Sequence, residues 1–374
     1  MTDPRSSRGA RMLDWLTRRM NVTEIFSLLT SYGLFYTELD TRKSLPDALE
    51  EALDRPLPSL ARWPRILGLV VVVLLAILIL TGALLAFYYL PTPDTAHASV
   101  GIILRELSFG WLIHNVHYWA AQLLLVVLVL RVLRFFFRAS YRKPRELVWV
   151  FAVALLLVCF HAELTGRFLP WTSTAYWSIT RSLEVVAAVP IYGSLVSFFA
   201  GAGGALVSDL TLLRFYILHI AVLPLLAVAL IYFHFSSVRR IGIVDFDEED
   251  RQPGRQALRK HIFNLLILMT ALVGLLVTLA TLAPTPFLEE ADAFSTPTGV
   301  GPPWYLLSSY GFLELTSKVV PAWIGGSLLF LFFTGFLTWP FIDRSRSPAV
   351  VRWGIGVALL ALWAALTLYG WRIA

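Results

Sequence analysis

Seven apolar runs dominate the chain, and each is about as long as a helix that crosses a lipid bilayer. A membrane-spanning helix needs roughly 20 apolar residues, and only helices or closed barrels satisfy their backbone hydrogen bonds inside lipid. The 374 residues are 57% hydrophobic and 15% charged, against about 25% charged in a soluble domain. We therefore expect an all-α polytopic membrane protein and exclude soluble, disordered and fibrous classes. The runs cover residues 64–89, 111–137, 146–169, 211–238, 262–283, 321–342 and 348–371.

The distribution of lysine and arginine predicts how the chain crosses the membrane. If the N-terminus is cytoplasmic, the segments on that side hold 25 basic residues and those on the other side hold six. This excess agrees with the positive-inside rule. The net charge of +6 therefore sets topology and indicates no nucleic-acid partner. We call the cytoplasmic side n and the other side p, and seven spans place the C-terminus on the p side.

Changes in composition predict four parts. The first is a polar cytoplasmic segment in which an apolar stripe within Met12–Met20 predicts an amphipathic helix on the membrane surface. Four spans, a charged linker and three further spans follow. Two long p-side loops, 170–210 and 284–320, are expected to carry short surface helices and a functional site. The four parts are residues 1–62, 63–240, 241–260 and 261–374.

Two histidines predict a metal-binding pair near the p side. His117 lies near the p end of the second span and His219 near the p end of the fourth, so they can face each other. Paired imidazoles from facing helices are a standard way to ligate haem iron in a bundle. His234 follows His219 by fifteen residues, about 22 Å along a helix. The alternative is that each is a core histidine bonded to a neighbour, although ionisable residues inside membranes usually serve function.

Glycines on the first and third spans fit the same interpretation. Gly68 and Gly82 lie fourteen residues apart on the first span. Gly166 ends the third span, and Ala152 stands fourteen residues before it. A flat macrocycle between helices needs positions without side chains, which glycine provides. Close packing of small residues between membrane helices is the alternative explanation.

Short motifs throughout the chain indicate a family. They are Thr81–Tyr89, Phe109–His117, Lys143–Glu146, Thr165–Trp171, Pro190–Gly193, Arg214–His219, Leu223–Pro224, Phe233–His234, Pro303–Tyr305 and Pro340–Asp343. In order and spacing they resemble cytochrome b of the Rieske/cytochrome b complexes. The division into four and three spans resembles the chloroplast and cyanobacterial cytochrome b fused to its three-helix subunit. The resemblance implies a four-helix bundle that holds two stacked haems b, plus three further helices.

The p-side haem site keeps the markers of that family. The resemblance implies that His117 and His219 ligate the iron, with Gly82 and Gly166 beside the macrocycle. His114 stands where the family often has an arginine near this haem, and it would contact a propionate without a permanent charge. We expect one haem b at this site.

The n-side haem site departs from the family pattern. The resemblance implies one ligand at His234 and another at a position where this chain has Arg131. Arginine stays protonated and is not an ordinary iron ligand. Gly68 is kept, but Ala152 replaces a glycine. We expect this haem to be absent or altered, with Arg131 filling the space and facing an anion such as a propionate or lipid phosphate. The alternatives are a haem held by His234 alone, or a ligand supplied by His261.

The quinone pocket departs from the family as well. The resemblance implies a p-side quinol pocket with walls from Trp171, Trp304 and Tyr305. Pro303 occupies the place of the glutamate in the family's Pro-Glu-Trp-Tyr motif, which accepts a proton from quinol. Proline cannot accept a proton, so another carboxylate would have to replace it. The candidates are Glu163, Glu184 and Glu314.

Other polar residues have weaker assignments. Arg134 and Arg239 match n-side positions that in the family serve haem propionates or the quinone pocket, although the positive-inside belt also explains them. His97 and His161 would hold a further metal or carry protons, or they are simply exposed or hydrogen-bonded. Cys159 is expected to be an apolar filler.

The resemblance implies a quinol- or quinone-reactive electron-transfer complex in a bacterial inner membrane. The expected partners are quinone, membrane lipids, a second copy of the chain, and a p-side Rieske iron–sulfur protein or c-type cytochrome. Without the n-side haem, electrons would have to leave on the p side. One alternative is a cytochrome b anchor that links the quinone pool to another extracytoplasmic oxidoreductase. The other is a scaffold subunit with little redox role.

Overall fold

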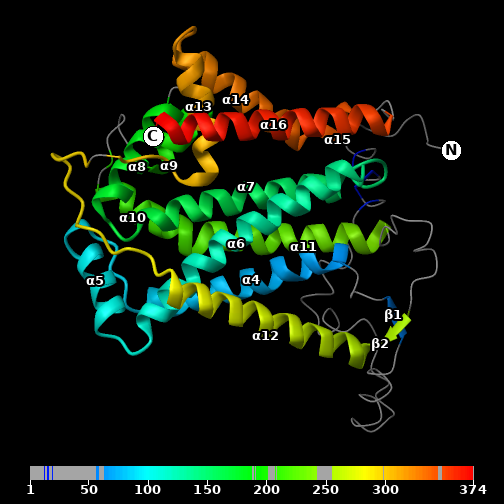
Figure 1. Cartoon of the computed structure of the whole chain (residues 1–374), viewed down its shortest axis with the longest axis horizontal. Helices are drawn as coiled ribbons and strands as arrows, with labels where there is room; N and C mark the ends of the chain where they lie inside the picture. The colour runs from blue at the N-terminus through cyan, green and yellow to red at the C-terminus, as the bar shows by residue number, and fades with distance from the viewer. Residues whose placement is uncertain are drawn as a thin grey trace.

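The computed structural model is a bundle of long helices with short helices gathered at one end (Figure 1). The predicted all-α class is confirmed, because named strands among the described residues are limited to two segments of three residues each. The structure describes residues 12, 15, 16, 19, 56–58, 63–187, 189, 191–200, 207, 209–241, 255–297, 299–343 and 348–373.

Four long helices form the centre of the bundle and coincide with the first four predicted spans. They are α4 (Trp63–Ala86), α6 (Gly110–Phe137), α7 (Glu146–Phe168) and a fourth made of α10 (Asp209–Ile217), η1 (Leu218–Val222) and α11 (Leu223–Ile241). Their axes run side by side, with α4 against α6 and α7 against α11 (Figure 1). Each is apolar along most of its length, because lipid offers no hydrogen-bond partners to polar groups.

The fourth helix widens into a π-helical turn at η1. There the Leu223 N–H donates to the Leu218 carbonyl, five residues earlier. Pro224 follows at once, and a proline lacks an N–H and clashes with the carbonyl four residues before it. Regular α-helix is therefore disfavoured at this point. Single π turns are frequent at functional sites, and this one contains His219.

The last three predicted spans also coincide with helices. These are α12 (Leu258–Leu282), α14 (Ala322–Leu337) and α16 (Ala349–Ile373). Among the described residues, five helices are long and apolar enough to cross a membrane, namely the four central ones and α16. The apolar parts of α12 and α14 are shorter. The run predicted at 321–342 is divided because Pro340, which lacks an N–H, lies in a separate short helix, α15 (Trp339–Ile342).

Short helices cover the end of the bundle at which α6 begins, on the left of Figure 1. Both long loops carry short helices, as predicted. They are α8 (Ser173–Ala187), α9 (Tyr192–Ala200), η3 (Trp304–Leu306) and α13 (Leu307–Ser317). A further short helix, α5 (Pro93–Arg105), lies between α4 and α6. The C-terminal end of α16 lies at this same end (Figure 1).

The opposite end carries a small sheet. Strand β1 (Pro56–Pro58) pairs antiparallel with β2 (Arg255–Ala257), so the segment before the first span is joined to the linker. Most of the predicted surface helix lies outside the described residues. Within it, Arg19 forms a salt bridge of 3.1 Å with buried Glu146 at the start of α7.

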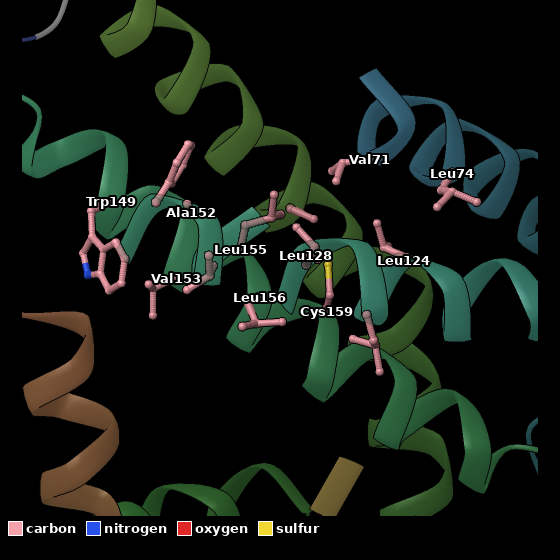
Figure 2. Close-up of a cluster of buried hydrophobic side chains, with 14 of the residues drawn as sticks. Val71, Leu74, Leu124, Leu128, Trp149, Ala152, Val153, Leu155, Leu156 and Cys159 are labelled. Carbon is pink, nitrogen blue, oxygen red and sulfur yellow. The ribbon is translucent and has the colours of Figure 1, made fainter. Parts of the chain in front are cut away.

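The largest cluster of buried apolar side chains lies between α4, α6 and α7 (Figure 2). Leu74, Leu128 and Trp149 are almost fully enclosed there, and the Trp149 indole N–H donates to the Phe336 carbonyl at 2.9 Å. The Cys159 sulfur lies within the same cluster, which confirms its assignment as an apolar filler. Since lipid tails are as apolar as leucine, close van der Waals contact is what holds such a cluster together.

Candidate functional site

His117 and His219 face each other at the end of the bundle covered by the short helices. His117 comes from the second turn of α6, and His219 from the π turn η1. Their ring centres are 6.1 Å apart and their planes meet at 73°. Two metal–nitrogen bonds of about 2 Å, plus half a ring on either side, give roughly 6 Å between ring centres. The observed spacing therefore fits one metal ion held between the two rings.

Hydrogen bonds on the far side of each ring fix the protonation of both imidazoles. The Thr81 hydroxyl donates to the Ile77 carbonyl and lies 2.8 Å from His117 Nδ1, so it accepts the Nδ1 proton. His219 Nδ1 donates to the Ala162 carbonyl at 2.8 Å. With Nδ1 protonated in both rings, each Nε2 carries a lone pair that can bind a metal.

Two glycines make room beside these rings. A Cβ at Gly82 would lie 3.1 Å from His117 Cε1, which is closer than ordinary contact. A Cβ at Gly166 would overlap His219 Cε1 and lie 3.0 Å from its Nε2. Each glycine follows a threonine, Thr81 or Thr165, whose hydroxyl reaches the histidine next to that glycine. The two sides of the site are thus built in the same way from α4 and α7.

A cavity of about 720 Å³ adjoins the histidine pair. Its lining includes His117, His219 and both glycines, and it extends to the loop at 299–303. His114 also lines it, with its Nδ1 3.4 Å from the Thr285 hydroxyl. A volume of this size suits a bound cofactor or a drug-sized ligand. The residues present fit a haem between the two imidazoles.

The second predicted haem position has a different arrangement. His234 Nδ1 donates to the Val148 carbonyl at 3.1 Å, so Nε2 is again the unprotonated nitrogen. Here Nε2 accepts a hydrogen bond of 2.5 Å from the Arg131 guanidinium. The Arg131 Cζ also lies 5.2 Å from the centre of the Phe135 ring. The nitrogen that would bind iron is therefore occupied by an arginine.

Little space remains at this second position. A Cβ at Gly68 would overlap the end of the Arg131 side chain, so the guanidinium fills the gap that the glycine leaves. The remaining cavity, which Ala152 also lines, is about 20 Å³. Such a volume accommodates about one water molecule. The residues present do not fit a second macrocycle.

The predicted quinone-pocket residues are only partly brought together. Pro303 lines the large cavity, whereas Trp171, Trp304 and Tyr305 pack around it without lining it. Trp171 has a left-handed φ of 49°, unusual for a residue other than glycine, and its ring packs edge-on against Phe168 at 5.1 Å. Trp304 is 40% exposed, while Tyr305 is buried.

Two buried polar side chains join Trp304 and Tyr305 to the bundle. Glu163 of α7 and Gln122 of α6 both line the cavity. Gln122 donates to Glu163 at 2.9 Å and accepts from the Trp304 indole at 2.7 Å. The Tyr305 hydroxyl donates to the other oxygen of Glu163. Sequence reasoning missed Gln122, although a glutamine inside an apolar span was a usable signal.

The other two candidate carboxylates do not reach the cavity. Glu314 lies on α13 and is not among the residues that line it. The side chain of Glu184 lies outside the described part of the chain. Tyr89 lines the cavity instead, and burial, followed by the effect of Tyr216, raises its pKa well above the ordinary value. Its hydroxyl therefore stays protonated and donates to the Leu169 carbonyl at 2.7 Å.

The remaining predicted residues lie apart from the cavity. His97 Nε2–H donates to the Leu288 carbonyl at 2.9 Å, and its ring stacks on Phe287. His161 bonds to the Leu157 carbonyl at 2.7 Å and to the Tyr192 hydroxyl at 2.9 Å. Within the described part of the chain, no three metal-binding side chains gather into one group. Arg134 is half-buried on α6, and the side chains of Arg239 and His261 lie outside the described part.

The chain is similar to known proteins over most of its length. Residues 53–242 match the family model described as cytochrome b/b6/petB, and residues 290–372 match cytochrome b(C-terminal)/b6/petD. Cytochrome b6 of Mastigocladus laminosus is 39% identical over 163 residues, which are 44% of this chain and 75% of that protein. Cytochrome b6 of Desmonostoc sp. (strain PCC 7906) is 34% identical over 208 residues, 56% of this chain and 96% of the relative. A solved hyperthermophilic respiratory Complex III shares the fold with a TM-score of 0.73 at 23% identity, covering 96% of this chain and 91% of that one.

Proposed function

Because the chain belongs to the cytochrome b family, as a membrane b-type cytochrome subunit of a quinol-reactive complex, we propose that it holds a single haem b. His117 and His219 would supply the two axial nitrogens, and Gly82 and Gly166 would leave room for the macrocycle. The bound haem supplies reversible one-electron transfer. The threonine and carbonyl partners of each Nδ1 keep both Nε2 atoms unprotonated and aimed by fixed rings.

One contact carries the proposal that the second haem is lost. The Arg131 guanidinium donates to Nε2 of His234, the atom that would otherwise bind iron. A cation at that atom excludes a metal ion by both space and charge. The 20 Å³ cavity beside it, against 720 Å³ at the other site, supports the same reading.

The loss of one haem would change the route of electrons. His219 and His234 are fifteen residues apart, about 22 Å along the helix axis. With one haem, this chain would offer a redox group near one membrane face alone, so electrons would enter and leave at the end with His117. We expect the partner there, near α5 and α8, to carry a Rieske iron–sulfur cluster or a c-type haem, in a complex containing two copies of this chain.

A second function also fits the single-haem arrangement. A cytochrome b that anchors a different extracytoplasmic oxidoreductase needs only one haem near one membrane face. The contact of Arg131 with His234, which leaves a single haem site, agrees with this arrangement. The subunits that copurify with the chain distinguish the two functions. A Rieske protein or c-type cytochrome supports the first function, and an unrelated oxidoreductase supports the second.

Two matched variants on the same helix test the single-haem proposal. His219→Ala should abolish the b-type absorbance of the purified complex, because it removes an axial ligand. His234→Ala should keep that absorbance, since its ring binds Arg131. Size-exclusion chromatography of both complexes controls for assembly. Loss of haem absorbance in an assembled His234→Ala complex would contradict the proposal.

A further inference from the structure

A buried carboxylate lies in the large cavity and has no role in holding haem. Glu163 supplies the one carboxylate among the described residues that line this cavity, and its side chain is 6% exposed. An ionised group inside a membrane protein is costly unless it is paired, and it usually marks a functional site. A buried ion pair is also weak evidence of stability, because apolar residues of similar volume often serve as well.

The two oxygens of Glu163 differ in their partners. Oε1 accepts from the Gln122 amide at 2.9 Å and from the Arg167 guanidinium at 2.9 and 3.2 Å. Oε2 accepts from the Tyr305 hydroxyl. A carboxylate has about four lone-pair sites, two on each oxygen. Oε1 is therefore saturated, and Oε2 keeps one acceptor position.

Neighbouring residues hold the carboxylate in a fixed orientation. The Gln122 amide accepts from the Trp304 indole at 2.7 Å while it donates to Glu163, so its own orientation is determined. Trp304 and Tyr305 belong to the same loop as Pro303, which lines the cavity. The network thus connects Glu163 directly to the loop that closes one side of the cavity.

We propose that Glu163 is the proton acceptor for quinol in this cavity, and this inference rests on the proposed quinol-reactive function. The O–H bond of a quinol hydroxyl breaks, and an O–H bond forms on Oε2 of Glu163. One electron leaves the quinol with each of its two protons and goes to a one-electron metal centre, either the haem b of this chain or a centre on a partner subunit. Glu163 accepts the two protons one after the other and releases the first before it takes the second. Gln122 and Tyr305 are positioning residues, because they act through the carboxylate.

Arg167 connects the buried carboxyl with the exposed surface of the bundle. The titratable groups that face Glu163 are Arg167 on its own helix and Tyr305 of η3, and Tyr118 of α6 lies beside Arg167. Arg167 forms a salt bridge of 2.9 Å with Oε1 of Glu163. Its side chain is 30% exposed, so it provides the solvent-facing side of the pair. We expect the proton to leave on this exposed side after each transfer.

Glu163→Gln in the purified complex tests the proposal, with Glu314→Gln as the matched control on α13. Duroquinol serves as the donor, and the rate of haem b reduction is followed optically between pH 5 and 9. We expect a fall on the order of 100-fold for Glu163→Gln, as for loss of a general base. Haem content and the apparent KM for duroquinol should stay the same, and Glu314→Gln should behave as wild type.

Glu163→Gln leaves Arg167 without its carboxylate partner, and the complex could then fail to assemble. A second measurement covers that case. Infrared difference spectra of the wild-type complex, recorded with duroquinol, should contain a protonated-carboxyl band that shifts in Glu163→Asp. An unchanged rate in an assembled Glu163→Gln complex, or a band that Glu163→Asp leaves unmoved, would overturn the assignment. If the wild-type complex neither holds haem b nor reacts with duroquinol, the proposed function itself fails.

Discussion

Gly166→Ala is the sharpest test of the proposal that haem lies beside Gly82 and Gly166, and Gly68→Ala is its matched control. A Cβ at position 166 would overlap His219 Cε1 and come to 3.0 Å from Nε2. The ring cannot turn away easily, because its Nδ1–H is held by the Ala162 carbonyl at 2.8 Å. At position 68 the new Cβ would meet the far end of the Arg131 side chain, which is long and flexible.

The expected magnitudes differ accordingly. Overpacking in an enclosed site costs about 1–3 kcal/mol, and if all of it falls on haem binding the affinity drops roughly 5- to 150-fold. For Gly68→Ala, the helix gains about 1 kcal/mol in propensity, which offsets the shift of one guanidinium. Haem affinity should therefore stay unchanged in the control.

Transfer of haem to excess apomyoglobin measures this difference, with both variants purified as the intact complex. Gly166→Ala should release haem b faster and be isolated with less of it, whereas Gly68→Ala should match wild type in both respects. The reasoning fails if Gly68→Ala loses haem to the same extent, because a macrocycle would then lie against position 68. It also fails if Gly166→Ala retains haem as tightly as wild type.

Three further predictions follow from other contacts. Thr81→Val removes the acceptor of the His117 Nδ1 proton and so lowers the basicity of that ligand, which should raise the haem midpoint potential. Thr165→Val should raise the potential less, because the Thr165 hydroxyl lies 3.4 Å from His219 Nδ1. A redox titration in which the two shifts are equal would contradict this order. Burial and a hydrogen bond to an aspartate raise the pKa of Tyr141, so its hydroxyl donates throughout the neutral range; Tyr141→Phe should lower stability by about 1.5–3 kcal/mol in thermal unfolding, and an unchanged midpoint would refute it. Arg131→His with Ala152→Gly replaces the guanidinium at Nε2 of His234 by an imidazole and removes a methyl group that lines the small cavity, so haem b should rise to two per chain; a haemochrome assay that still gives one would refute that geometry.

The long helices and the two histidine sites were accessible from sequence because their signals are local or periodic. Apolar runs fix where helices lie in lipid, and fifteen residues between His219 and His234 fix their separation along one helix. The replacement at Arg131 was likewise visible as a charged residue in an apolar run. Its contact with His234 is a matter of side-chain packing, which the sequence left open among several alternatives.

Other features depend on contacts between segments that lie far apart in the sequence, and the sequence alone does not predict these contacts. Three glutamates were equal candidates to replace the missing carboxylate, and only the rotation of α7 and the docking of the 299–305 loop bring Glu163 into the cavity. Gln122 was missed because its role arises from two partners on other elements. The interruption at Pro340 was readable as a proline in a helix, yet the hydrophobic run alone extended through it.

The number of haems b per chain is the measurement that tests the account most directly. The intact complex is purified, its haem b is measured as the pyridine haemochrome, and the contributions of other subunits are subtracted. The contact between Arg131 and His234 predicts one haem b per copy of this chain and a single midpoint in the redox titration. Two haems per copy would show that the second site binds its cofactor despite Arg131, and would contradict the account.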